Sequence, residues 1–211
     1  MVVALEKTAN RKKATVLTPV AQFLLLYHLE VGSIEGLSAR EIAPLVPYSY
    51  TSVTLGITCL TDLGLCEKLQ QGQRNKAVHF ELKGAELWKQ AQPYLQSPVV
   101  RLVYCDRLNE TDATISGINA LAHYTMLNSE SEQTVMMTKD GYNQAKKADL
   151  IENENNYDGH VAIEIWKYPV VSKDHQQWVD KLSLAISLKD DDDPRVEKEV
   201  ERLISEMTWM D

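Results

Sequence analysis

The chain has 211 residues and a formal net charge of −8, and this length suits one large domain or two small ones. With 44% apolar and 25% charged residues, and only 9 Gly and 7 Pro, the composition excludes collagen-like and wholly disordered proteins. No apolar run approaches the roughly 20 residues of a membrane-spanning helix, and residues 1–14 are basic without the apolar stretch of a secretory signal. We therefore expect a cytoplasmic protein that makes no contact with a membrane.

Charge is divided unequally along the chain. Residues 1–97 hold ten Lys and Arg against eight Asp and Glu, whereas residues 98–211 hold twelve against twenty-two. This division predicts a first half that can approach a polyanion and an acidic second half that would repel one.

Two helices are predicted at the start of the first half. Thr18 as N-cap and Pro19 in the first helical position begin a helix that ends near Gly32. Residues 38–41, with the sequence Ser-Ala-Arg-Glu, form a capping box for a short second helix, which Pro47 closes.

A third helix and a hairpin follow. Ser49 can cap the third helix, and Gly64 stands where a left-handed C-terminal cap is expected. Its buried stripe consists of Val53, Ile57 and Leu60. Residues 65–69 and 76–82 are predicted as two strands around a turn at 71–75, and a fourth helix ends around residue 95. Three helices followed by a hairpin predict a winged helix-turn-helix domain over residues 15–97, after a basic flexible tail at 1–14.

The order and spacing of these segments resemble the winged-helix domain of MarR-type transcriptional regulators. The resemblance is carried by residues 38–43 (Ser-Ala-Arg-Glu-Ile-Ala), 60–65 (Leu-Thr-Asp-Leu-Gly-Leu) and 80–84 (Phe-Glu-Leu-Lys-Gly). It covers about 80 residues and implies sequence-specific binding to double-stranded DNA by the third helix and the wing.

The candidate DNA-contacting residues lie at the start and on the exposed side of the third helix, and at the tip of the hairpin. They are Ser49, Tyr50, Thr51, Ser52, Thr54, Thr58, Gln73, Arg74, Asn75 and Lys76. Hydroxyl groups can contact phosphates and base edges, and a helix N-terminus favours a phosphate. The third helix departs from the family, however, because no Lys or Arg lies between Arg40 and Lys68. The alternative is therefore a protein-interaction module that keeps the winged-helix shape without DNA affinity.

The second half, residues 98–211, is predicted as an α/β-type domain with a smaller sheet, which makes the whole chain α+β. Strands are expected at 99–105, 133–138 and 160–168, and an exposed loop at 149–159. A helix capped by Thr114 or Ser116, another near 179–188, and a last amphipathic helix that begins at Asp193 and Pro194 complete this half.

This half resembles the C-terminal domain of AbiEi-like antitoxins, winged-helix proteins that repress the operon of a nucleotidyltransferase-like toxin. The resemblance is carried by residues 115–124 (Ile-Ser-Gly-Ile-Asn-Ala-Leu-Ala-His-Tyr), 179–184 (Val-Asp-Lys-Leu-Ser-Leu) and 193–196 (Asp-Pro-Arg-Val). It implies a repressor that binds its own promoter and a toxin partner for the acidic half. The chain does not reveal whether it forms a homodimer.

No pattern of residues points to an enzyme, a metal or a cofactor. The acidic run 190–193 is explained by helix capping, and the five histidines have no zinc spacing. Glu164 and Lys167 differ by three positions, so on a strand they point to opposite faces and do not form a nuclease pair. His123 lacks a partnering nucleophile. The three cysteines have neither metal-knuckle nor disulfide spacing and are expected to be reduced.

Overall fold

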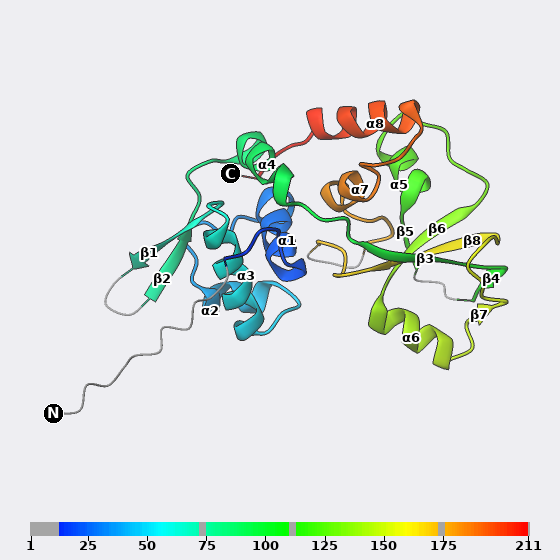
Figure 1. Cartoon of the computed structure of the whole chain (residues 1–211), viewed down its shortest axis with the longest axis horizontal. Coiled ribbons are helices and arrows are strands. Elements are labelled where there is room, and N and C mark those ends of the chain that lie inside the picture. The colour runs from blue at the N-terminus through cyan, green and yellow to red at the C-terminus, as the bar shows by residue number, and fades with distance from the viewer. Residues whose placement is uncertain (1–12, 72–74, 110–112, 173–175, 211) are drawn as a thin grey trace.

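The computed structural model describes residues 13–71, 75–109, 113–172 and 176–210 (Figure 1). The helical segments are α1 (Pro19–Leu26), η1 (Tyr27–Val31), α2 (Ala39–Ile42), η2 (Ala43–Leu45), α3 (Tyr50–Asp62), α4 (Gly84–Ala91), η3 (Gln92–Tyr94), α5 (Gly117–Tyr124), α6 (Lys139–Lys147), α7 (Lys181–Ser187) and α8 (Pro194–Ser205). The strands are β1 (Glu67–Gln71), β2 (Asn75–His79), β3 (Val99–Cys105), β4 (Arg107–Leu108), β5 (Thr114–Ile115), β6 (Gln133–Thr138), β7 (Ile151–Glu152) and β8 (Val161–Trp166). The chain is α+β, as predicted. None of the helices in these described ranges is both long and apolar enough to cross a bilayer.

The helix boundaries of the first half follow the predicted capping chemistry. The Thr18 hydroxyl accepts a hydrogen bond from the Ala21 amide, and the helix that begins there runs to Gly32, its last five residues forming the π-helix η1. Ser38 donates from its amide and its hydroxyl to the Glu41 carboxylate, which completes the capping box of α2. The Ser49 hydroxyl accepts from the Ser52 amide at the start of α3. These caps satisfy amides that have no partner within their helices.

The hairpin is present, with strand boundaries that differ from the prediction. Strands β1 and β2 pair antiparallel, with Lys68 opposite Val78. The first strand begins two residues later than predicted because Leu65 and Cys66 are buried in the core. The second ends at His79, and the Phe80 amide bonds to a carboxylate instead of a strand. The segment 36–38 adds a short third edge, since the Val78 amide donates to the Leu37 carbonyl at 2.9 Å.

The second half is built on a four-stranded sheet with the order β3-β8-β6-β5. Strand β8 runs parallel to β6 and antiparallel to β3. Helix α6 covers one face of the sheet, and α5, α7 and α8 lie on the other (Figure 1). Side chains alternate along β8 as predicted: Ile163 and Ile165 pack on the α6 side, whereas Trp166 joins the larger core.

Several elements of the second half were not predicted. Helix α6 follows β6 directly, and the Thr138 hydroxyl caps it by accepting from the Gly141 amide. The segment 149–159, expected to be a loop throughout, contains the short strand β7, which pairs with β4.

The two halves share one hydrophobic core. Helix α1 is buried along almost its whole length, and its core cluster extends to Trp166, Tyr168, Leu182 and Val196 of the second half. The buried Gln22 amide donates to the Gln96 carbonyl and to the Tyr168 hydroxyl, at 2.8 Å each. The chain then returns after α8, where the Met210 amide donates to the Leu29 carbonyl at 3.0 Å.

Two carboxylates meet where η1 touches the start of α7. Glu30 accepts from the amides of Lys181 and Leu182 at 3.0 and 3.1 Å. Asp180, the buried N-cap of α7, accepts from the amides of Ser183 and Val171. Burial, with a further contribution from the charge of Asp180, raises the pKa of Glu30 to about 8 although its two backbone hydrogen bonds act in the opposite direction. The first half is thereby fastened to the second through the amides of α7.

Glu30→Gln is expected to flatten the dependence of stability on pH between 4.5 and 8. The folded state holds the Glu30 proton more tightly than the unfolded chain, so the stability of the native protein falls as pH rises through this window. The free energy of unfolding changes by about 1.4 kcal/mol for each unit by which the pKa of Glu30 differs between the folded and unfolded states. Urea unfolding at pH 5 and pH 8 measures the difference. The exposed Glu86→Gln of α4 serves as the control, and a slope equal to that of native protein in Glu30→Gln would contradict the expectation.

Candidate nucleic-acid interface

A groove lies between α3, the start of α2 and one face of the β1–β2 hairpin. It has a volume of about 520 Å³. We call it the α3 groove, and it is lined by Ser38, Ala39, Arg40, Tyr50, Thr54, Ile57, Lys68, Lys76 and Val78. The hairpin contributes Lys68, Lys76 and Val78 together because side chains on a strand alternate, and the register places Lys68 opposite Val78.

Three cations surround the α3 groove, and none of its lining residues is acidic. Arg40 comes from α2, Lys68 from β1 and Lys76 from β2. The Arg40 guanidinium lies 6.0 Å from the centre of the Tyr50 ring, and the Lys68 ammonium donates to the Thr58 hydroxyl at 2.7 Å. Three elements that are separate in sequence therefore bring positive charge to one hollow.

The site predicted from the sequence contains Tyr50, Thr54 and Lys76. Arg40 and Lys68 are evident from the sequence as charges that could neutralise phosphates, but the prediction did not place them beside α3. The signal was available: the even-numbered residues of the hairpin share one face, and that face includes both lysines.

The hydroxyl groups of α3 are mostly engaged within the helix. Thr54 donates to the Tyr50 carbonyl and Thr58 to the Thr54 carbonyl, at 2.8 and 2.7 Å. Ser49 and Ser52 bond to each other at 3.0 Å. Because the protons of Thr54 and Thr58 are used in this way, their oxygens can act only as acceptors, and the Thr58 oxygen already accepts from the Lys68 ammonium. Acceptors suit the amino groups of base edges and do not suit phosphate oxygens.

The predicted surface of α3 is open to solvent. Ser49, Tyr50 and Thr51 are exposed, and Ser52, Thr54 and Thr58 are half-buried. Leu55, on the same side of the helix, keeps 60% of its surface exposed. Gln73 and Arg74, like the basic tail at residues 1–12, lie outside the described residues, and Asn75 is placed by its backbone as the first residue of β2.

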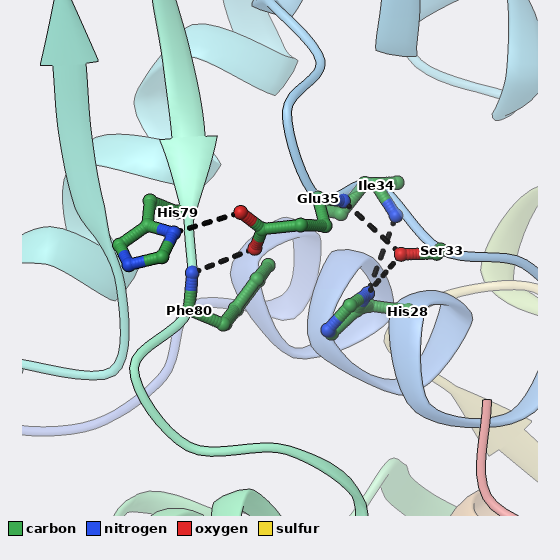
Figure 2. Close-up of polar contacts among 6 residues, drawn as sticks. All are labelled: His28, Ser33, Ile34, Glu35, His79 and Phe80. Carbon is green, nitrogen blue, oxygen red and sulfur yellow. Dashed lines mark hydrogen bonds and ion pairs between the residues drawn. The ribbon is translucent and has the colours of Figure 1, made fainter. Parts of the chain in front are cut away.

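A carboxylate helps to hold the end of the hairpin against the helices of the first half. Figure 2 shows Glu35 reaching across to the end of β2, where it accepts from the His79 ring nitrogen Nδ1 and from the Phe80 amide, at 2.8 Å each. Glu35 stands in the loop that contributes segment 36–38 to the hairpin. The orientation of β1 and β2 relative to α3 therefore depends on this loop.

His28, which is buried in η1, also holds this loop in place. Its Nδ1 accepts from the Ile34 amide at 3.2 Å and from the Ser33 hydroxyl at 3.4 Å (Figure 2). Its ring stacks on Phe80 with centroids 4.0 Å apart. Because burial lowers the pKa of His28 to about 4, the ring is neutral at physiological pH, with its proton on Nε2.

Other polar groups that the sequence singled out have structural partners. Buried Glu164 accepts from the Ser116 hydroxyl and the Trp166 indole, while Lys167 is exposed and donates to the Ser97 carbonyl. Asp193 caps α8, as predicted. The ring of His123 stacks on Trp178. Cys59, Cys66 and Cys105 are buried free thiols. Among the described residues, no three or more His, Cys, Asp and Glu gather as a metal site.

Comparison of the chain with protein-family models, with curated proteins and with solved structures finds no match. The MarR-like and AbiEi-like resemblances therefore stay predictions from the residues quoted above.

His28→Gln is expected to remove part of the loss of stability that acid causes. The unfolded chain binds a proton at His28 near pH 6.5 and the folded state only near pH 4, so native stability falls as pH drops through this window. Between pH 6.5 and 4, the free energy of unfolding should fall by roughly 2 kcal/mol less in the variant than in the native protein. Denaturant unfolding at both pH values tests this, with the exposed His160→Gln as control. Equal losses in the variant and the native protein would show that His28 does not titrate with folding.

Proposed function

We propose that the chain is a sequence-specific DNA-binding regulator whose residues 15–97 form a winged helix-turn-helix domain. In this proposal α3 enters the major groove, and β1 and β2 are the wing. The order of three helices and a hairpin supports it, as does the third short edge at 36–38. The observation that carries the proposal is the α3 groove, where Arg40, Lys68 and Lys76 surround the exposed side of α3 without an acidic neighbour among the lining residues.

Each part of this surface would have a distinct task on a duplex. The three cations would neutralise phosphates, which supplies affinity without reading sequence. The acceptor oxygen of Thr54 and the apolar Leu55 would read base edges, where adenine and cytosine present amino groups and thymine presents a methyl group. The Tyr50 side chain, 51% exposed at the first position of α3, adds an aromatic ring whose centre lies 6.0 Å from the Arg40 guanidinium.

The double variant Arg40→Gln/Lys76→Gln should weaken binding to every duplex. The loss of two phosphate contacts should also reduce the slope of log K against log salt by about 2, since each contact contributes roughly 0.9. Fluorescence anisotropy at several salt concentrations measures both effects, on the duplex from upstream of the chain's own reading frame and on a scrambled duplex.

The control for this experiment is Lys139→Gln/Lys147→Gln, which removes two exposed charges from α6, an element of the second half. It should leave affinity and salt slope close to those of the native protein. If both double variants reduce binding equally, the attraction is due to overall charge and the α3 groove is not the interface.

A second candidate function is favoured by exposed apolar side chains in the first half. Leu55 of α3 and Leu45 of η2 keep 60% and 46% of their surfaces exposed, and Tyr50 keeps 51%. Exposed large apolar and aromatic side chains are typical of protein-binding surfaces. On this reading the winged-helix shape serves a protein partner and the duplex is not bound.

Leu55→Ala separates the two candidates. On a DNA-reading surface it should lower the preference for the upstream duplex over the scrambled one, by on the order of 1 kcal/mol, and leave the salt slope unchanged. Leu69→Ala is the matched control, because Leu69 is 46% exposed but lies on the opposite face of the hairpin from Lys68. Absence of duplex binding by the native protein at low salt would favour the protein-binding module.

The proposal gives the second half the task of binding a partner. Its acidic excess, twenty-two Asp and Glu against twelve Lys and Arg, suits a basic protein surface. The resemblance to AbiEi-like antitoxins names a toxin as that partner. Co-expression with the product of the neighbouring reading frame, followed by purification of a complex that dissociates in high salt, tests this part separately from DNA binding.

A further inference from the structure

Helix α3 carries no side chain of the types that select guanine. The major-groove edge of guanine offers two acceptors, O6 and N7, and Arg or Lys makes the commonest specific contact with them. The thirteen residues of α3 include no Arg, Lys, Asn, Gln or His. The cations of the α3 groove come from other elements, and the Lys68 ammonium already donates to the Thr58 hydroxyl. A guanine that faces α3 therefore receives no bidentate donor from this helix.

The hydroxyl protons of three threonines of α3 are committed within the helix. Thr54, Thr58 and Thr61 each donate to the carbonyl four residues earlier, at 2.8, 2.7 and 2.9 Å. A hydroxyl that donates to its own helix can only accept from a base. At these positions guanine O6 and N7 would lose their water without gaining a donor, which is unfavourable. The threonines therefore disfavour guanine.

Leu55 is the apolar group that α3 presents to solvent. It keeps 60% of its surface exposed, whereas Val53 and Ile57 of the same helix are buried in the core. The preceding residue, Thr54, lines the α3 groove together with its three cations, so a duplex attracted by these charges also comes up to Leu55. In the major groove, thymine alone among the four bases carries an apolar group, its 5-methyl. Leu55 is thus suited to thymine.

We propose that α3 recognises A·T base pairs in the major groove through contact of Leu55 with the thymine methyl group. This inference rests on the proposed DNA-binding function and adds the base chemistry that the surface selects. Leu55 removes the methyl group from water, while the Thr54 oxygen accepts from a base amino group. Sequence preference then comes from a methyl group and not from hydrogen bonds to guanine. Burial of one methyl group changes the binding constant about fourfold.

The test compares four alternating duplexes of equal length that differ in single chemical groups. Uracil in place of thymine removes the methyl group and keeps the hydrogen-bonding groups of the A·T pair. An inosine–cytosine duplex resembles A·T in the minor groove, because the 2-amino group of guanine is absent, but resembles G·C in the major groove. Use of 5-methylcytosine in place of cytosine then adds a methyl group to that major groove. Competition against a fluorescent duplex of mixed sequence at low salt measures the four affinities.

The A·T duplex should bind about fourfold more tightly than A·U, and inosine–5-methylcytosine about fourfold more tightly than inosine–cytosine. Leu55→Ala should bring both ratios close to one and leave the salt slope unchanged, because it removes the apolar contact and no charge. Leu69→Ala of β1 is the matched control, since Leu69 is 46% exposed, and it should keep both ratios.

Three results would overturn the inference and leave the proposed function intact. They are equal binding of A·T and A·U, inosine–cytosine binding as tightly as A·T, and unchanged ratios in Leu55→Ala. The second of these would place recognition in the minor groove, where the two duplexes are alike. Absence of binding to every duplex at low salt would overturn the proposed function itself, and this inference with it.

Discussion

The burial of α1 is the constraint on which the rest of the structure depends. A helix that is apolar around its whole circumference needs cover on every side, and α1 is buried from Ala21 to Leu26. Helix α3 covers one side, and residues of the second half, among them Tyr168, cover another. The one polar residue of this stretch, Gln22, has three hydrogen bonds, to Gln96 and Tyr168. The core around α1 therefore needs residues from both halves, whereas the cluster on the α6 side of the sheet belongs to the second half alone.

The shared core is connected to the hairpin by the short loop that follows η1. His28 of η1 is held inside the core, Glu35 in the following loop holds the end of β2, and only six residues of the chain separate them. Displacement of the core beneath His28 would reach the hairpin through this short connection. The position of Lys68 and Lys76 relative to α3 thus depends on the interior of the protein as well as on the hydrogen bond from Lys68 to Thr58 of α3.

Local chemistry explains which parts of the fold were predictable. Caps and turns such as Thr18, Ser49 and Gly64 act through backbone groups within three or four residues, and the sequence contains all of that information. Helix α6 was missed because it buries only Tyr142 and Ala145, too few apolar positions for a period of 3.6 residues to be visible. The strand β7 depends on pairing with β4, forty residues earlier, which no local pattern contains. For the same reason, the α3 groove could be predicted only in part: α3 and Lys76 were identified, but the approach of Arg40 and Lys68 is a product of tertiary packing.

The return of the chain to the first half has a consequence for how the protein is made. Trp209 packs on Gly84 and Trp88, and the Met210 amide bonds to Leu29, so the first half gains contacts from residues that are synthesised more than a hundred positions after it. At roughly 5 to 20 residues per second, more than a hundred residues must follow Leu95 from the ribosome before these contacts can form, which takes on the order of ten seconds. During this interval the side of α4 that carries Trp88 is uncovered. A chaperone or a neighbouring nascent chain could bind this side before Trp209 packs on it.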